Sequence, residues 1–418
     1  MRNAVILCLA SLLLLSACGG GGGGSSSGGG GGGGGGGTVQ VIATAGPPNV
    51  EPLVMDGGPA NALNTPFVTV KICAPGSTTT CQTIDHIEVD TGSSGLRILS
   101  SVLTISLPAV MSGSSTLAEC LQFADGSAFG PLATADLSLP TSGKTAAGLT
   151  VQVIGASGYT VPADCPGTPE DTVTTFGANG ILGVGPFMQD CGQACVAETT
   201  PLPGTYYTCT SGGTCTDSNV ALAAQVSNPV LFFSGDNNGV IVELPAPPAA
   251  GTASLTGGVL VFGIGTEPNN ALGTAKVLKA SDVTGFVDAS FNGATDLNAA
   301  LDSGSNLNFF TDSGIAGCTT AVGFYCPAST VNLSATLTAV SGGATATAPF
   351  TVVNAETAFQ ANTSAFVIPN LGGQLSVANS NSNTIQFHRG IPFYFGRNVF
   401  TAIENQTAAG TTGPYFAY

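Results

Sequence analysis

The sequence contains no tryptophan, two histidines and eight lysine and arginine residues among 418 residues. Against these eight stand 24 Asp and Glu, so the formal net charge is −16 and the positive surface that neutralises nucleic-acid phosphates is not available. Nucleic acid is therefore excluded as a partner. Charged residues make up 8% of the chain, where about 25% is typical. Because disorder requires low hydrophobicity together with high net charge, this composition predicts a folded body.

Long apolar runs are also scarce, and the one of note is at the N-terminus. Ala4–Ala17 follows Arg2, which is typical of a secretory signal. The segment Leu15–Cys18 resembles the lipobox of bacterial lipoproteins. That resemblance implies a signal peptide over residues 1–17 and a lipid on Cys18. The alternative is an ordinary signal peptide with an incidental cysteine.

Residues 18–37 are Cys18 followed only by glycine and serine. Because the segment after Cys18 has no side chain that can pack, we expect it to be a flexible tether. The residue after Cys18 is Gly19 rather than Asp, which by the same resemblance favours the outer membrane. We therefore expect a location in the bacterial cell envelope. A folded body of 418 − 37 = 381 residues would be held at the membrane by the lipid.

Twelve cysteines, less Cys8 in the signal and Cys18 at the anchor, leave ten. An even number in an exported protein predicts disulfides. Zinc is the alternative for the central cysteine cluster, but His86 and His388 are far from it in sequence, and we expect no metal and no cofactor. The predicted bonds are Cys73–Cys81, Cys120–Cys165 and Cys318–Cys326, with Cys191, Cys195, Cys209 and Cys215 pairing among themselves.

Short β-branched and aromatic runs, bounded by Gly, Pro, Asn or Ser, dominate the chain after residue 45 and predict strands. Helical periodicity is clear in one place, Asn219–Val226. The sequence thus predicts a mainly β body of the barrel or sandwich type. The predicted strands include Phe67–Ile72, Thr150–Ile154, Val230–Phe233, Gly239–Leu244, Val259–Phe262 and Thr384–Phe387.

Two similar loops occur 302 − 90 = 212 residues apart, each behind an apolar strand. Asp90–Ser93 reads Asp-Thr-Gly-Ser and Asp302–Ser305 reads Asp-Ser-Gly-Ser. Each is followed by an apolar-apolar-Gly triplet, Ile181–Gly183 in the first half and Tyr394–Gly396 in the second. This repetition predicts two lobes that face each other.

Two such loops meeting at a lobe interface would bring two carboxyl groups together. Like charges at that distance share one proton. The ionised group can then take a proton from water while the protonated group polarises a carbonyl. The alternative is that both loops are simple turns of a structural surface β-protein.

Over residues 65–418 the chain resembles the pepsin-like, two-lobed aspartic peptidases. The resemblance rests on Ile87–Leu96, Gly177–Gly185, Ala299–Ser305 and Phe395–Phe400. It implies a mainly β, two-lobed barrel architecture with a cleft between the lobes and few short helices. The N-terminal lobe is expected over residues 38–262 and the C-terminal lobe over residues 263–418. The implied activity is hydrolysis of peptide bonds in a peptide or unfolded protein, by a monomer.

The resemblance assigns Asp90 and Asp302 as the catalytic pair. The residues after each Asp would support it. Hydroxyl-to-backbone bonds between the loops would come from Thr91 and Ser303, backbone N–H groups from Gly92 and Gly304, and bonds to the outer carboxylate oxygens from Ser93 and Ser305.

Three positions depart from the family pattern. The flap segment carries Phe123, before Asp125 and Gly126, where the family has tyrosine. Arg97 stands where the family has tryptophan, and a cation there is expected to favour the ionised carboxylates. Arg397 follows the second triplet, where the family commonly has an acid. These departures favour an alternative function: a catalytically weak or inactive pepsin-fold lipoprotein that binds a peptide or protein in the cleft.

The two histidines are expected to lie outside the site. His86 is expected on the surface or packed, four residues before Asp90 on one strand. His388 and Arg389 are expected to be solvated charge at an edge.

Overall fold

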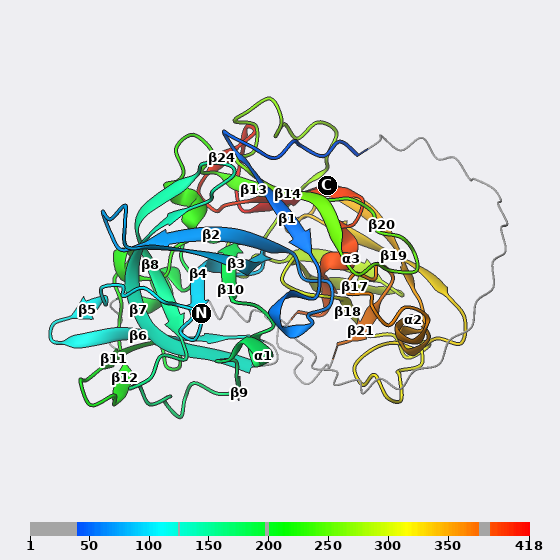
Figure 1. Cartoon of the computed structure of the whole chain (residues 1–418). Helices are drawn as coiled ribbons and strands as arrows, with labels where there is room; N and C mark the ends of the chain where they lie inside the picture. Colours follow the sequence, from blue (N-terminus) through cyan, green and yellow to red (C-terminus); the bar gives the residue numbers. More distant parts are fainter. Residues whose placement is uncertain (1–39, 124–125, 197–199, 376–384) are drawn as a thin grey trace.

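The computed structural model describes residues 40–123, 126–196, 200–375 and 385–418. The predicted signal peptide, Cys18 and the predicted tether lie outside these ranges, as do Asp125 and Thr384. Strands dominate the described chain, as predicted, and form two lobes joined by a sheet (Figure 1). No described helix has the length and apolarity that a membrane crossing demands.

The first lobe is built on a closed ring of six strands. β3 pairs with β2, β2 with β7, β7 with β8, β8 with β4, β4 with β10, and β10 with β3 again. Closure leaves these strands without free edges, as the predicted barrel requires. The six strands are β2 (Phe67–Cys73), β3 (Cys81–Asp90), β4 (Ser94–Leu99), β7 (Gly126–Ser138), β8 (Thr145–Ile154) and β10 (Gly180–Val184).

A smaller layer extends this lobe from the outer end of β7. It contains the flap hairpin, in which β6 runs into β7, and the disulfide-rich insertion that pairs with β6. Its strands are β5 (Met111–Ser112), β6 (Ser115–Gln122), β9 (Thr168–Pro169), β11 (Tyr206–Cys209) and β12 (Cys215–Asp217).

The second lobe holds a seven-stranded sheet in the order β20-β19-β16-β17-β22-β18-β21. Its central pair, β17 and β22, is parallel, as β3 and β10 are in the first lobe. The strands are β16 (Val287–Phe291), β17 (Ala294–Leu301), β18 (Asn308–Phe310), β19 (Val331–Thr338), β20 (Thr345–Val352), β21 (Gly372–Gln374) and β22 (Phe387–Arg389).

An antiparallel platform connects the lobes and joins distant parts of the chain. Its order is β1-β14-β13-β23-β26-β15. The predicted lobe boundary after residue 262 falls at the end of β14 and stays a prediction. The strands are β1 (Val50–Met55), β13 (Gly239–Leu244), β14 (Leu255–Phe262), β15 (Val277–Lys279), β23 (Arg397–Ala402) and β26 (Tyr415–Ala417); β24 (Thr407–Ala408) and β25 (Thr411–Thr412) form a separate hairpin.

Helices are few and short, as predicted. They are α1 (Val173–Phe176), α2 (Ala355–Ala361) and α3 (Ile391–Tyr394), with 3₁₀ turns at Gly58–Ala60, Gly192–Cys195, Leu222–Ala224 and Pro229–Phe232.

Three local predictions were wrong. Of the described residues in the strand expected over Thr384–Phe387, only Phe387 is in a strand, because the parallel pairing of β22 with β17 begins at that residue. The helix expected over Asn219–Val226 is only the 3₁₀ turn Leu222–Ala224, because the N–H of Val220 and the amide of Gln225 bond to the neighbouring disulfide loop instead. The strand expected over Val230–Phe233 is the 3₁₀ turn Pro229–Phe232. There the side chain of Asn228 accepts from Val230 N at 3.1 Å, and the fixed φ of Pro229 starts a helical turn.

All five disulfides predicted among the ten cysteines are present. The open question of the central cluster is resolved as Cys191–Cys195 and Cys209–Cys215. The other three bonds are Cys73–Cys81, Cys120–Cys165 and Cys318–Cys326.

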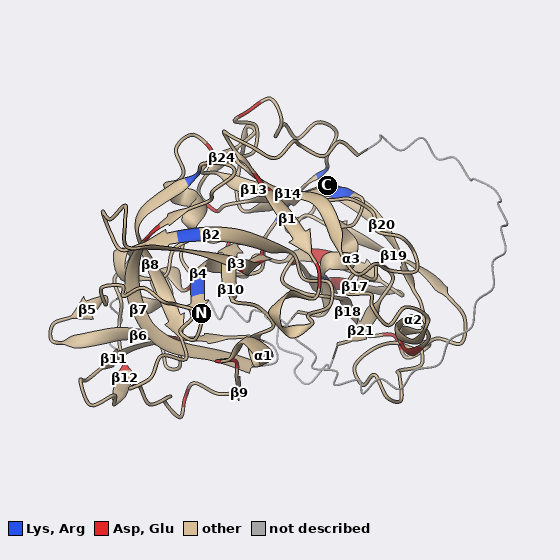
Figure 2. Ribbon diagram, viewed as in Figure 1, with Lys and Arg blue, Asp and Glu red and all other residues tan. Residues whose placement is uncertain are grey.

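Charged residues are sparse along the ribbon (Figure 2). Three of the basic ones, Arg97, Lys144 and Arg389, are buried. Lys144 is paired with Asp236 at 2.6 Å. The lobes are therefore held by apolar packing and disulfides, with ion pairs at a few buried points.

Candidate active site

The two Asp loops meet at the interface of the lobes. Asp90 ends β3, and Asp302 directly follows β17. Their side chains are buried, with exposed fractions of 0% for Asp90 and 2% for Asp302. A Cβ placed on Gly92 would lie 2.7 Å from Asp302 Cγ, and one on Gly304 would lie 2.7 Å from Asp90 Oδ1. Each loop therefore presses its glycine against the carboxyl group of the other, and only glycine fits there.

A reciprocal pair of hydrogen bonds links the loops. The backbone N–H of Thr91 donates to Ser303 Oγ at 3.1 Å, and the N–H of Ser303 donates to Thr91 Oγ1 at 3.0 Å. Ser303 Oγ in turn donates to Val89 O at 2.7 Å, and Thr91 Oγ1 lies 3.5 Å from Leu301 O. These bonds cross between lobes more than 200 residues apart in sequence and fix the separation of the two loops.

The glycine N–H groups point at the carboxyl groups. Gly92 N donates to Asp90 Oδ1 at 2.6 Å, and Gly304 N donates to Asp302 Oδ1 at 2.8 Å. Ser305 Oγ adds a bond to Asp302 Oδ2 at 2.9 Å. Ser93 is buried in the first loop, and its expected bond to Asp90 stays a prediction.

Burial and mutual repulsion shift the acid strength of the pair. Burial, and then the charge of Asp302, raises the pKa of Asp90 well above its ordinary value. Burial also raises the pKa of Asp302, against the lowering effect of its hydrogen-bond donors. The two carboxyl groups therefore favour holding one proton between them.

The structure corrects the prediction for His388. Arg389, expected like His388 to be solvated charge at an edge, is also buried and donates to Ala348 O at 2.8 Å. His388 is fully buried in β22, between β17 and β18. Its Nε2 lies 3.0 Å from Asp302 Oδ2. His86, as expected, lies apart from the pair: it is partly exposed, packs against Phe67 and faces Asp56.

The second triplet was also assigned wrongly. In the first lobe, β10 sets Gly183 opposite Asp90. In the second, β22 sets Arg389 opposite Leu301, so the counterpart of Gly183 is Gly390. The residues His388-Arg389-Gly390 thus take the place expected for Tyr394–Gly396, which lies further along in α3 and the turn after it. The sequence did not reveal that this segment corresponds to Ile181–Gly183, because His388 and Arg389 are polar although their strand is buried.

Tyr394, predicted only as a member of the triplet, instead bonds to the Asp loops. Its hydroxyl lies 2.9 Å from Thr91 Oγ1, and its side chain is fully buried. Arg397, expected beside the site, donates to Phe393 O at 2.7 Å from β23. Because Gly390 is followed by Ile391, Arg397 does not stand at the position compared with the family's acid.

Arg97 is buried and already paired, which corrects its predicted effect on the carboxyl pair. Its Nη2 lies 2.7 Å from Glu119 Oε1 and 3.1 Å from Asp190 Oδ2. Tyr206 donates to the same Asp190. A buried guanidinium requires such partners, and they neutralise the charge that the sequence suggested for the site.

Phe123 contributes to the core of the first lobe. It is 6% exposed and packs edge-on against Phe176, with ring centroids 5.9 Å apart. Its N–H donates to Gly126 O at the end of the flap hairpin. Its ring does not line the described pocket beside the Asp pair.

That pocket is largely apolar around a polar floor. Its polar end is formed by the Asp loops and His388, and its walls are aromatic and aliphatic. The lining side chains include Asp302, His388, Asp190, Phe187, Phe286, Ile385 and Phe416. It could receive an apolar side chain of a ligand next to the carboxyl groups.

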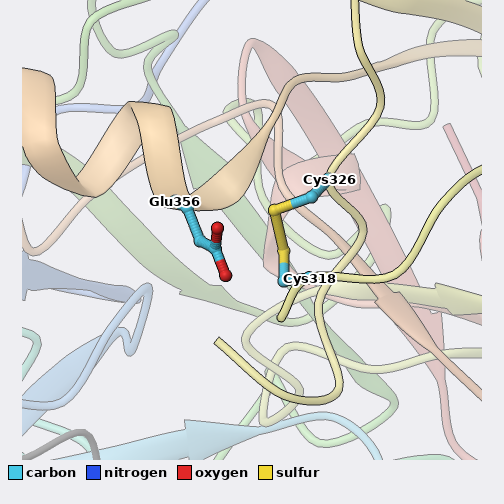
Figure 3. A group of neighbouring side chains, drawn as sticks. All are labelled: Cys318, Cys326 and Glu356. Atoms are coloured by element: carbon cyan, nitrogen blue, oxygen red, sulfur yellow. A yellow bond between two sulfur atoms is a disulfide. The ribbon is translucent and has the colours of Figure 1, made fainter. Parts of the chain in front are cut away.

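One group of possible metal ligands occurs in the described residues: Cys318, Cys326 and Glu356 (Figure 3). The two sulfur atoms are bonded to each other. Glu356 Oε1 accepts from the backbone N–H groups of Thr319 and Thr320 at 2.9 and 2.6 Å. These atoms are therefore already used to close a loop, and we assign no metal to them.

Comparisons with known proteins agree with the fold. An aspartic proteinase from Irpex lacteus superposes with a TM-score of 0.50 at 16% identity, covering 90% of this chain and 96% of that chain. At this identity the likeness shows the two-lobed pepsin-like fold alone. No curated protein matches the sequence. Residues 45–418 match the model of the family described as "Protein of unknown function (DUF3443)", and the chain belongs to that family.

Proposed function

We propose that this protein is an aspartic-type endopeptidase that hydrolyses peptide bonds with a water molecule activated between Asp90 and Asp302. The observation that carries the proposal is the meeting of two buried carboxyl groups in loops cross-linked by Thr91 and Ser303. A rigid pair that shares one proton supplies both a general base and a general acid.

The proton transfers balance over one cycle. The ionised carboxylate takes a proton from water as the water oxygen attacks the peptide carbonyl carbon. The other carboxyl group donates its proton to the carbonyl oxygen. The resulting diol then collapses: the C–N bond breaks, the amine receives the proton held by the base, and a diol proton returns to the acid. The pair ends as it began.

The pocket supports a peptide substrate with an apolar side chain near the cleaved bond. Phe187, Phe286 and Ile385 offer apolar contacts beside Asp302, and burial of such a side chain is favourable. The scarcity of basic residues makes an acidic polypeptide a poor partner. We propose a monomeric enzyme acting on peptides or unfolded protein.

We further propose that the protein is anchored in the bacterial envelope through a lipid on Cys18, with the outer membrane as its site. The support is the sequence resemblance to a lipobox and the glycine-rich tether that follows it. Metabolic labelling with a fatty-acid analogue tests this: wild type should be labelled and Cys18→Ala should not. Labelling of the variant would contradict the anchor.

The test of the enzyme is cleavage of an unfolded protein between pH 3 and 7. Asp90→Asn and Asp302→Asn should each lower the rate by about 10²–10⁴-fold, and a statine-type transition-state mimic should block the wild type. Asp171→Asn is the matched control, because Asp171 is exposed and outside the site. Undiminished cleavage by either dyad variant would refute the mechanism.

One observation favours a second candidate, peptide binding without turnover. Both carboxyl side chains are almost inaccessible to solvent. Saturable binding of an apolar peptide, competed by the statine mimic but with no cleavage products at any pH from 3 to 7, would favour this binder.

A further inference from the structure

The two lobes approach the Asp pair with the same strand arrangement but with different side chains at one position. In the parallel pair of β3 and β10, Ile181 lies opposite the residue two before Asp90. In the parallel pair of β17 and β22, His388 lies opposite the residue two before Asp302. An apolar side chain in one lobe is thus matched by an imidazole in the other.

His388 reaches the carboxyl group of its own lobe. Nε2 lies 3.0 Å from Asp302 Oδ2, and the ring is fully buried. Nδ1 has no hydrogen-bond partner in the described part of the chain. A neutral ring that carries its proton on Nε2 donates this bond to an ionised Asp302, whereas a ring protonated on Nδ1 would accept it from a protonated Asp302.

Burial keeps this ring neutral. It lowers the pKa of His388 to about 4, against the raising effect of Asp90. The apolar neighbour on β18 is Phe309, with its ring centroid 6.1 Å away. The titratable groups facing the imidazole are Asp302 and Asp90; Tyr394, whose hydroxyl is held by Thr91, lies close enough to both carboxyls for their charges to raise its pKa.

We propose that His388 is a positioning residue: its Nε2–H donates to Asp302 Oδ2 and so places the shared proton of the pair on Asp90. The glycine donors are matched in the two lobes, so they cannot select one carboxyl group. The side chains that bond to Asp302 Oδ2 are Ser305, through Oγ, and His388, through Nε2. A donor present on one side only stabilises the ionised form on that side. Asp302 is then the base toward water, and Asp90 is the acid toward the carbonyl.

The catalytic consequence rests on the proposed peptidase function, but the hydrogen bond does not. We therefore test the bond first by NMR on the full chain with ring-¹⁵N histidine. The chain has two histidines, so His86→Gln assigns both signals. At pH 7 His388 should be the neutral Nε2–H tautomer, should titrate near pH 4, and should shift in Asp302→Asn.

Three NMR results would overturn the proposal. These are an Nδ1–H tautomer, a cationic ring at pH 7, or ring signals unchanged by Asp302→Asn. None of them requires that the protein cleave anything. A protein with no peptidase activity therefore refutes the proposed function while the NMR still decides the role of His388.

Two substitutions separate positioning from packing in the active enzyme. His388→Gln keeps an N–H donor at the place of Nε2, and His388→Leu fills a similar volume without one. His388→Leu should move the acid limb of kcat/KM upward by about one pH unit, because Asp302 then ionises less readily. In His388→Gln the acid limb of the pH profile of kcat/KM should stay near its wild-type position. In His86→Gln it should not move. An unshifted limb in His388→Leu, with NMR showing the folded protein, would contradict positioning.

Discussion

At the scale of single residues, Ser303 is the side chain on which the contact between the Asp loops depends most directly. Its hydroxyl accepts from Thr91 N and donates to Val89 O, both in the other lobe and both buried. Removing the Ser303 hydroxyl would leave the buried Thr91 N–H and Val89 carbonyl without this hydrogen-bond partner, which lowers the stability of the folded state.

We expect Ser303→Ala to lower the free energy of unfolding by about 1–3 kcal/mol and to slow peptide hydrolysis, because the two carboxyl groups lose their fixed separation. Ser303→Thr keeps the hydroxyl, as Thr91 does in the first loop, and should retain most of both properties. Urea unfolding and initial rates measure the effect. A Ser303→Ala protein equal to wild type in both would show that the hydroxyl does not couple the lobes.

Residue-scale prediction from the sequence succeeded where the information was local. The Asp-Thr-Gly and Asp-Ser-Gly tripeptides each contain the turn glycine and the hydroxyl that the loop needs, so the meeting of Asp90 and Asp302 could be anticipated. It failed for His388 and Arg97. Their partners are Asp302, in the loop after β17, and Glu119, on β6. A polar residue is predicted to be exposed when such distant partners are not visible in the sequence.

At the scale of elements, the reassigned second triplet makes a sharp prediction about glycine. A Cβ on Gly390 would overlap the carbonyl oxygens of Ser305 and Leu307, and one on Gly183 would lie 2.6 Å from Ser93 Oγ. The same atom on Gly396 would meet only Ala246 Cβ, at 3.5 Å. Gly390 and Gly183 therefore allow a strand to pass directly beneath an Asp loop.

Gly390→Ala and Gly183→Ala should each displace an Asp loop and abolish activity, with a large loss of stability. Gly396→Ala should cost about 1–2 kcal/mol, since its φ of +72° is unfavourable for alanine. The stability of the three variants is compared by thermal unfolding, and their activity by hydrolysis assays. A small loss of stability and activity in Gly390→Ala, together with a large loss in Gly396→Ala, would support Tyr394–Gly396 as the second triplet.

Elements with strong local periodicity were predictable, and those set by context were not. Phe67–Ile72 and Gly239–Leu244 are rich in β-branched residues and form the strands β2 and β13. Val230–Phe233 has the same composition, but the preceding Asn228 and Pro229 fold it into a helical turn. The periodicity of Asn219–Val226 is defeated by hydrogen bonds to a disulfide loop.

At the scale of the whole molecule, several buried acids tie stability to pH. Burial raises the pKa of Asp90 and Asp190 well above their usual values, and that of Glu243 in β13 to about 7. A group whose pKa is raised by folding stabilises the folded state fully below its unfolded pKa. That stabilisation is lost as the pH rises through the folded pKa.

Burial of His388 acts in the opposite direction between pH 5 and 6.5, because it lowers the pKa of this group to about 4. The acids with raised pKa outnumber this one histidine, so the molecule should be more stable at pH 5 than at pH 8. For Glu243 the contribution disappears between about pH 4.5 and 7, which corresponds to about 3 kcal/mol at most and about 2–4 °C of Tm for each kcal/mol. Repulsion within the −16 surface acts in the same direction, but salt screens it. The Tm difference should persist in 0.5 M NaCl. A Tm that rises from pH 5 to pH 8 at this salt concentration would contradict the effect of the buried acids.

The platform between the lobes also has a consequence for how the chain reaches its native state. β1 pairs with β14, β13 pairs with β23, and β23 pairs with β26 near the end of the chain. Contacts of such long range form slowly, because a large loop must close before any of them is made. The first strand to emerge during synthesis thus cannot complete its sheet until the last one is available. If the protein is exported as an unfolded chain, as proposed, this sheet can be completed only after the whole chain has crossed the inner membrane.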